Sequence, residues 1–319
     1  MFYSFIKFYA RLTIKIYCRK IIINKPGILN IRGPVLLACN HPNSFLDGMI
    51  ITTLFDEPVH SLARGDAFKN NRINKFLRSM QLLPVYRTSE GVENLEHNYT
   101  TFSDCINAFE KKEVVLIFSE GRCENEWHLR PLKKGTARLA VTAWEKGIPL
   151  MVIPTAINYS SFKNFGKEVH LFFGEPLNAQ TILSHPSEGK KHLIFNEMLS
   201  AQLKQYVYEI DPADKATIRK KFSLVANAAT YFLLLPAIIG WFIHAPLFYA
   251  CKFFSKTFYN SGHFDSVQTS LLLLLYPFYL LLLFFLSAWL IHPIVAIVLL
   301  LTSPFFAWAA IRVKIACGI

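Results

Sequence analysis

A histidine and an aspartate six positions apart, His41 and Asp47, are the residues of this sequence whose types and spacing best suit acid–base chemistry. A carboxylate bonded to one imidazole nitrogen fixes the tautomer of the ring and stabilises its protonated form. The other ring nitrogen is then free to take a proton from a hydroxyl group. The pair therefore predicts a general base that prepares a hydroxyl for acyl transfer.

The residues before His41 predict a buried strand. Val35 to Cys39 is a continuous apolar run that follows the turn-forming pair Gly33 and Pro34. A short apolar run bounded by turn residues is typical of a strand inside a sheet. His41 would then lie just beyond the end of that strand.

The residues after His41 predict the start of a helix. Pro42 suits the first helical position, and Asn43 and Ser44 suit a helix start, so Asp47 would lie in the first turns. Two residues six positions apart on a regular helix point about 240° away from each other. The pair can therefore meet only if His41 lies in the loop before the helix.

Four further polar clusters follow apolar runs that also predict strands. The runs and their clusters are Val59–Ala63 with Arg64-Gly65-Asp66, Leu82–Tyr86 with Arg87-Thr88-Ser89, Val114–Phe118 with Ser119-Glu120-Gly121-Arg122, and Leu150–Ile153 with Pro154-Thr155. Helices are predicted between them near residues 44–54, 67–80, 92–111 and 135–146. This alternation indicates an α/β fold, in which ligands bind at the carboxyl ends of the strands. We expect all five clusters at that edge.

Four blocks of these residues carry a resemblance to a known family. They are His41 with Asp47, Pro84-Val85-Tyr86-Arg87, Phe118-Ser119-Glu120-Gly121 followed by Arg122, and Val152-Ile153-Pro154; the run Leu132–Arg138 is also similar. On these blocks, over roughly residues 30–180, the chain resembles the glycerolipid acyltransferases. That family includes glycerol-3-phosphate and lysophosphatidic acid acyltransferases.

The chain departs from the family pattern at three places. Five residues separate His41 from Asp47, where four are usual, and the second block has no glycine. Ser119 stands where the third block usually has proline. The wider spacing and the pattern of Asn43, Phe45 and Asp47 resemble the branch of fungal-type glycerol-3-phosphate and dihydroxyacetone-phosphate acyltransferases.

The resemblance implies a fold, a reaction and roles for residues. The fold is a mixed α/β sheet with flanking helices. An acyl thioester, on coenzyme A or a carrier protein, donates the acyl group directly to glycerol-3-phosphate or a lysophospholipid such as lysophosphatidate, with no further cofactor. His41 acts as the base and Asp47 orients it. The substrate-binding residues implied are Asn43, Arg87 for the acceptor's phosphate, Glu120, Gly121, Arg122, and Pro154 beside the donor.

Composition indicates a membrane protein. Of the 319 residues 52% are hydrophobic, and the mean hydropathy is +0.29. No formal charge occurs from Phe222 to Cys251 or from Ser266 to Ile311. Since about 20 apolar residues span a bilayer, the second block predicts two spans that turn near His292 and Pro293. The first block predicts one tilted span or, preferably, a kinked re-entrant hairpin.

Basic residues flank the apolar blocks and favour the hairpin. They are Lys215, Arg219, Lys220 and Lys221 before the first block, Lys252 and Lys256 between the blocks, and Arg312 and Lys314 after the second. Positive residues mark the cytoplasmic side of a membrane. All three clusters can be cytoplasmic only if each block enters and leaves on the same face. We therefore expect an integral membrane protein whose catalytic domain faces the cytoplasm.

The N-terminal residues predict a basic amphipathic helix. Lys7, Arg11, Lys15 and Arg19 recur every four residues among apolar and aromatic side chains. Such a helix lies in a lipid interface, and packing on the catalytic domain is the alternative. The predicted organisation is a membrane-surface helix at 1–29, an acyltransferase domain at 30–212 and a C-terminal membrane region at 213–319.

The net charge of +12 suits anionic phospholipid head groups better than nucleic acid, for which no recognisable module is present. Two other classes of protein remain open. A metal-dependent hydrolase could use His41, Asp47 and Glu120, although no metal ligands occur at a recognisable spacing and no metal site is expected. A non-catalytic membrane protein could retain the fold as a binding module. Six cysteines without paired spacing predict no disulfide framework.

Overall fold

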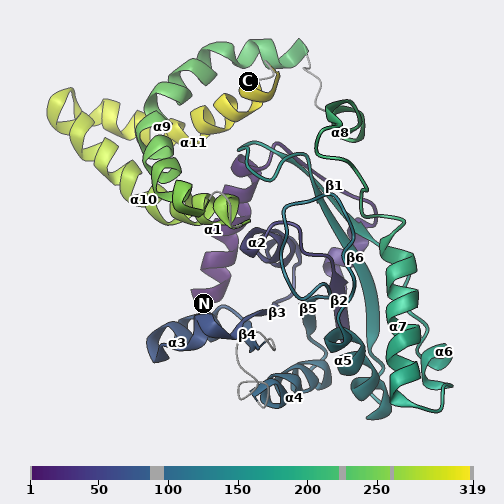
Figure 1. Cartoon of the computed structure of the whole chain (residues 1–319). Coiled ribbons are helices and arrows are strands. Elements are labelled where there is room, and N and C mark those ends of the chain that lie inside the picture. Colours follow the sequence, from purple (N-terminus) through teal and green to yellow (C-terminus); the bar gives the residue numbers. More distant parts are fainter. Residues whose placement is uncertain (1, 87–96, 223–227, 259–261, 317–319) are drawn as a thin grey trace.

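A seven-stranded sheet lies at the centre of the computed structural model, which describes residues 2–86, 97–222, 228–258 and 262–316 (Figure 1). The strand order is β1-β7-β6-β2-β5-β3-β4. The strands are β1 (Lys20–Ile23), β2 (Val35–Cys39), β3 (Val59–Arg64), β4 (Leu82–Val85), β5 (Val114–Phe118), β6 (Met151–Tyr159) and β7 (Glu168–Phe173). The five strands predicted from the sequence are all present, and β1 and β7 are additional.

Parallel pairing brings the polar clusters to one edge of the sheet. β2 pairs in parallel with β5 and β6, and β3 pairs in parallel with β4 and β5. β6 and β7 are antiparallel, which confirms the expected mixed sheet. Cys39 at the end of β2 stands opposite Phe118 and Thr155. His41 lies two residues after Cys39, and Glu120 lies two residues after Phe118.

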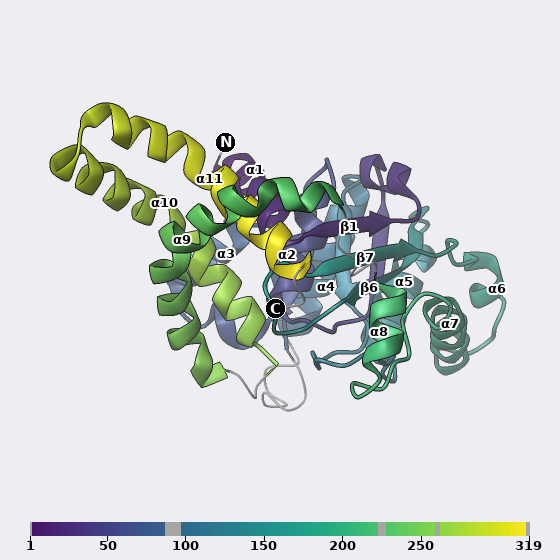
Figure 2. The same ribbon diagram turned by 90° about the horizontal axis from the view of Figure 1, so that it is seen from above.

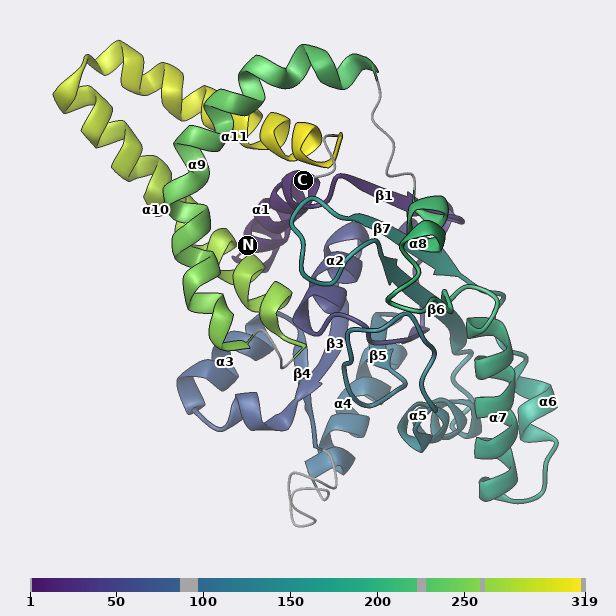
Figure 3. The ribbon, with the colours of Figure 1, turned by 45° about the horizontal axis from the view of Figure 1, so that its top comes forward.

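Helices cover both faces of the sheet (Figure 3). One apolar core joins β2, β5 and β6 to α4, α5, α6 and α7, and a second core joins the opposite face to α1 and α2. The helices of the domain are α1 (Phe2–Tyr17), α2 (Phe45–Leu54), α3 (Asn71–Ser79), α4 (His97–Glu110), α5 (Lys134–Glu145), α6 (Ala179–Leu183), α7 (Glu188–Leu203) and α8 (Lys215–Lys221). Short 3₁₀ helices occupy Pro26–Asn30, Gly65–Phe68, Ala228–Leu233 and Lys256–Phe258.

α1 packs on the domain with one face and exposes the other. Lys7 donates to the carbonyls of Asp56 and Glu57, and Arg11 donates to the last carbonyls of α2. These contacts satisfy the carbonyls that a helix leaves unpaired at its C-terminus. Phe5 and Phe8 point outward and are largely exposed. The helix thus packs on the domain, which was the alternative prediction, and it also presents an apolar face that suits a lipid interface.

Three C-terminal helices are long and apolar enough to cross a membrane: α9 (Leu234–Ser255), α10 (Phe264–Leu290) and α11 (Pro293–Ala316). α10 and α11 turn at His292 and Pro293, as predicted. The re-entrant hairpin preferred for the first block is wrong for its described residues, because α9 is one helix that contains Pro246. Pro236 lies in the first turn, where a missing N–H leaves no hydrogen bond unmade, and a single internal proline bends a helix without reversing it.

The α10–α11 pair projects from the domain with both of its open ends at the domain (Figure 2). Asp265 at the start of α10 bonds to Asn43, and Arg312 near the end of α11 donates to the carbonyl of Arg19. The turn between the helices lies far from both ends (Figure 1). The basic residues that flank this pair therefore lie on the same side of it.

Candidate active site

His41 and Asp47 meet at the start of α2. The Nδ1 atom of His41 lies 2.8 Å from Oδ2 of Asp47. α2 begins at Phe45, so His41 lies in the loop before the helix, as its spacing of six positions from Asp47 requires. The prediction that Pro42 is the first helical residue is wrong. Ser44, with φ at 52°, turns the chain sharply just before the helix and brings Asp47 back toward His41.

Three donors converge on the Asp47 carboxylate, which is fully buried. They are Nδ1–H of His41, the backbone N–H of Asn43 at 2.8 Å and the Tyr159 hydroxyl at 2.7 Å. Because an ionised carboxylate only accepts, Nδ1 of His41 carries the proton and Nε2 is left as the acceptor. The His41 side chain is 14% exposed. Its second nitrogen can therefore serve as a base for a molecule that enters the site.

Packing also sets the plane of the His41 ring. The ring stacks on Phe118, with 3.9 Å between the ring centroids and 12° between the planes. The backbone N–H of His41 donates to Oε2 of Glu120 at 2.8 Å. These contacts join the end of β2 to the end of β5. They orient the imidazole before any substrate binds, and such preorganisation lowers the barrier to proton transfer.

Glu120 braces the backbone around His41. The residue is 4% exposed, and its second oxygen accepts from the backbone N–H of Arg130 at 3.0 Å. Burial raises the pKa of Glu120 from 4.5 to about 7. Its oxygens face these two amides and not the His41 ring. Among the described residues, no group of three or more His, Cys, Asp or Glu side chains is placed to hold a metal ion.

The rest of the third block forms a turn beside Glu120. Gly121 has φ at +71°, a conformation that favours glycine, and a side chain there would meet Lys133. Arg122 is 57% exposed and lies 3.4 Å from Glu124. Arg130 also contacts Glu124, at 3.3 Å. Two guanidinium groups thus flank one carboxylate at the rim of the site.

The remaining predicted residues lie at different depths. Pro154 is buried in β6 and stands opposite Ala38, three positions before His41. Arg87 lies outside the described residues. Tyr86, the residue before it, packs its ring directly against Gly65, where any side chain would collide with that ring.

Sequence reasoning missed Tyr159 and assigned no partner to His263. Tyr159 lies 112 positions from Asp47, and the apolar strand that carries it shows no local sign of a polar role. Nδ1 of His263 lies 2.7 Å from the Ser44 hydroxyl, 219 positions away in the sequence. Burial and the neighbouring Asp47 charge raise the pKa of Tyr159, so this phenol remains a donor. Both contacts join segments that only folding brings together.

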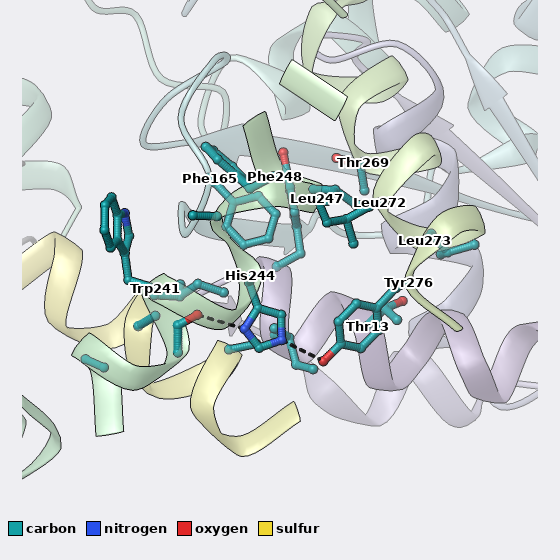
Figure 4. Close-up of a pocket in the computed structure, with 18 of the residues that line it drawn as sticks. Thr13, Phe165, Trp241, His244, Leu247, Phe248, Thr269, Leu272, Leu273 and Tyr276 are labelled. Carbon is teal, nitrogen blue, oxygen red and sulfur yellow. Dashed lines mark hydrogen bonds between the residues drawn. The ribbon is translucent and has the colours of Figure 1, made fainter. Parts of the chain in front are cut away.

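An apolar cavity of about 610 Å³ lies among α1, α9, α10 and α11 (Figure 4). His244 and Tyr276 form a polar pair in its wall: Nε2 of His244 lies 3.1 Å from the Tyr276 hydroxyl, and Nδ1 donates to the Gly240 carbonyl at 2.8 Å. Met49 of α2 and Tyr17 of α1 also reach the cavity. Its volume falls within the range of small-molecule pockets, about 300–1,000 Å³.

Comparisons with known proteins point to one family. A family model described as Acyltransferase matches residues 20–158. The chain is 26% identical over 179 residues to the 1-acyl-sn-glycerol-3-phosphate acyltransferase of Bacillus subtilis (strain 168), a match that covers 55% of this chain and 82% of the relative. The crystal structure of the 1-acyl-sn-glycerophosphate (LPA) acyltransferase PlsC from Thermotoga maritima is 14% identical, with a TM-score of 0.46, and the match covers 66% of this chain and 81% of that one.

Proposed function

Because this chain belongs to the glycerolipid acyltransferase family, we propose that it transfers a fatty acyl group from an acyl thioester to the hydroxyl of lysophosphatidate or glycerol-3-phosphate in phospholipid biosynthesis. The observation that carries the proposal is the His41–Asp47 contact, which leaves Nε2 of a partly exposed imidazole as a proton acceptor.

In the proposed mechanism His41 is the general base and Asp47 orients it. Nε2 takes the proton of the acceptor hydroxyl while the hydroxyl oxygen attacks the thioester carbonyl. The tetrahedral intermediate collapses with cleavage of the C–S bond, and the thiolate takes the proton back from the His41 imidazolium. The products are an ester and a free thiol. The acyl group passes directly between the substrates, so no covalent acyl-enzyme forms.

Lysophosphatidate is the preferred acceptor for two reasons. The Bacillus subtilis relative is named for 1-acyl-sn-glycerol-3-phosphate, which is lysophosphatidate. The apolar cavity among α1, α9, α10 and α11 also suits the single acyl chain that lysophosphatidate has and glycerol-3-phosphate lacks. We propose that this cavity receives the acyl chain of the acceptor.

The phosphate of the acceptor would bind arginine. A guanidinium group offers a planar fork that matches phosphate oxygens. Arg87 occupies the phosphate-binding position of the second block, and Arg122 is the alternative because it is exposed beside the Glu120 turn. Asn43, Glu120, Gly121 and Pro154 would shape the pocket around the two substrates.

Transfer assays on the purified full-length protein in detergent test this function. We expect acyl-coenzyme A or an acyl carrier protein to support transfer to lysophosphatidate or glycerol-3-phosphate, and we expect activity to persist with a metal chelator. His41→Ala serves as the control for background transfer. Hydrolysis that depends on added metal would favour a hydrolase. Absence of transfer to every lysolipid and glycerol phosphate tested would favour a non-catalytic binding protein.

The proposed location is an integral membrane protein with its catalytic domain on the cytoplasmic face. The basic residues on both sides of the α10–α11 pair and those of α8 favour this orientation. Single cysteines placed near Lys256 and Arg312, before the α10–α11 pair and near its end, in a chain without its native cysteines should resist an impermeant external reagent in intact cells. External labelling at both sites would place these ends, and the catalytic domain that they contact, on the outer face and overturn the proposed orientation.

A further inference from the structure

The first turn of the membrane helix α10 contacts the loop that carries His41. The Asn43 side-chain amide donates from Nδ2 to Oδ2 of Asp265 at 2.7 Å. The Ser266 hydroxyl donates to the Asn43 carbonyl at 2.9 Å and accepts from the Leu46 N–H at 3.1 Å. A helix that would serve only as an anchor has no need of these bonds.

Asp265 is the centre of a buried polar cluster outside the dyad. Its carboxylate is 1% exposed and forms an ion pair with Lys167, which is fully buried. The Tyr17 hydroxyl donates to its other oxygen. A buried ion pair is costly to form, and removal of one partner leaves an unpaired buried charge and is strongly destabilising. Each member comes from a different part of the chain: Tyr17 from α1, Lys167 from the position before β7, and Asp265 from α10. The cluster therefore connects these three segments.

The Asp265 carboxylate decides which way the Asn43 amide faces. Since a carboxylate only accepts, the NH₂ group of Asn43 must point at it, and the amide oxygen must point away. Among the described residues that oxygen, Oδ1, is buried without a hydrogen-bond partner. A buried acceptor without a donor is unfavourable, and a native protein retains one where a ligand or water supplies the donor.

A second path runs from the same cluster to the dyad. The Lys167 ammonium lies 5.7 Å from the centroid of the Tyr159 ring, and the Tyr159 hydroxyl donates to Asp47. Lys167 therefore contacts both Asp265 and the phenol that holds Asp47. The α10 helix is linked to the dyad through Asn43 on one side and through Lys167 and Tyr159 on the other.

We propose that Asp265, supplied by the membrane helix α10, is a positioning residue for acyl transfer that holds Asn43 with its Oδ1 presented as a hydrogen-bond acceptor for a hydroxyl of the acceptor substrate. The proposal rests on the proposed function, because it assigns the hydroxyl-bearing acceptor to the site of His41. The C-terminal region is then a part of the active site as well as an anchor.

The test removes the cluster without leaving a buried charge. Asp265→Leu alone would strand Lys167, so the variant is the triple substitution Tyr17→Phe, Lys167→Met and Asp265→Leu, which replaces three polar groups with apolar ones of similar size. We expect kcat to fall 10- to 100-fold with soluble short-chain substrates in detergent. The matched control is Ser287→Ala, which removes a buried hydroxyl from the same helix far from the loop and should leave kcat within twofold. A folded triple variant with kcat within twofold of wild type would overturn the proposal.

Restoring an acceptor separates positioning from packing. A second triple variant combines Tyr17→Phe and Lys167→Met with Asp265→Asn. It has a side-chain carbonyl at position 265 that can accept from Asn43, and we expect part of the lost kcat to return. In an Asn43→Ala background the Leu and Asn forms at position 265 should have equal kcat, since Asp265 acts through Asn43. If the kcat values of the Leu and Asn forms differ as much in the Asn43→Ala background as they do with Asn43 present, Asp265 acts by another route.

A readout without catalysis keeps this proposal distinct from the proposed function. Amide hydrogen exchange of the peptide that spans residues 40–47 should be at least tenfold faster in the triple variant than in wild type and unchanged in Ser287→Ala. If wild type transfers no acyl group but the exchange responds, the proposed function fails while the coupling of α10 to the loop holds. Unchanged exchange in a folded triple variant would show that Asp265 does not hold the loop.

Discussion

The His41 loop and the cavity among α1, α9, α10 and α11 both adjoin α2 and have opposite chemistry. In the loop, the Asp47 carboxylate accepts three hydrogen bonds and the His41 ring is held by a stack and a backbone bond. In the cavity, one His–Tyr pair interrupts an apolar wall (Figure 4). Directional bonds fix one geometry, whereas apolar contact depends on area and tolerates different occupants. Changes in the loop should therefore alter rate, and changes in the cavity should alter substrate preference.

Removal of the base should have the largest effect. His41→Ala should abolish turnover because it removes Nε2, the proposed acceptor of the hydroxyl proton. Asp47→Asn should lower kcat by roughly 10² to 10⁴, since the amide no longer enforces the productive tautomer. Steady-state kinetics with both substrates checks this, with circular dichroism as the control for folding. Near-normal transfer by folded His41→Ala protein would remove this residue from the mechanism.

Loss of a phosphate-binding arginine should affect the acceptor. A charge-assisted hydrogen bond contributes about 1.5–3 kcal/mol, so Arg87→Ala should raise the KM for lysophosphatidate roughly ten- to a hundredfold and leave the donor KM little changed. Lysine at that position should recover only part of the affinity. A larger effect from Arg122→Ala would assign the phosphate to Arg122. Wild-type acceptor KM in both variants would indicate an acceptor without phosphate.

Removal of one donor to Asp47 should have a moderate effect on rate. Tyr159→Phe deletes the 2.7 Å hydrogen bond while the ring remains, and we expect kcat to fall about tenfold with both KM values nearly constant. Tyr208→Phe is the matched control, because that hydroxyl bonds to His170 and does not contact the dyad. Equal effects of the two substitutions would show that Tyr159 has no special part in orienting Asp47.

The raised pKa of Glu120 predicts a pH effect on stability. The folded protein holds this proton up to about pH 7, whereas an unfolded chain releases it near 4.5. The free energy of unfolding should therefore fall as pH rises from about 4.5 to about 7, by about 3 kcal/mol from this group. Thermal unfolding across this range measures it, with Glu120→Gln as the comparison. If the Gln variant shows the same decline, the decline arises from other groups.

Partial filling of the cavity should have the smallest effect. Ala245→Phe adds a ring to the α9 wall, and Ala250→Phe adds the same ring to an exposed position of α9 that does not line the cavity. Each buried CH₂ group contributes about 0.8 kcal/mol, so Ala245→Phe should lower kcat/KM for long-chain relative to short-chain lysophosphatidate about three- to tenfold. If both variants keep the wild-type chain preference, the cavity does not hold the acceptor's chain.

Local pattern in the sequence was enough to predict much of the fold. The bounds of β2 and β5 agree with the predicted runs, and the turn between α10 and α11 lies at His292 and Pro293, as predicted. The four polar blocks and their family resemblance were also readable, because each block lies within a short stretch of chain. Apolar runs and turn residues act over a few positions, and short-range signals of this kind need no knowledge of packing.

Contacts between distant segments required the tertiary structure. Nothing near Tyr159 predicts that it bonds to Asp47, and nothing near Asp265 predicts that it bonds to Asn43, 222 positions away. The form of α9 likewise required the structure, since the sequence does not show that Pro236 lies in its first turn and that Pro246 is its one internal proline. A sequence shows which side chains can donate, accept or carry charge. Only the folded chain shows which of them meet, because partners far apart in sequence are selected by the packing of whole helices and strands.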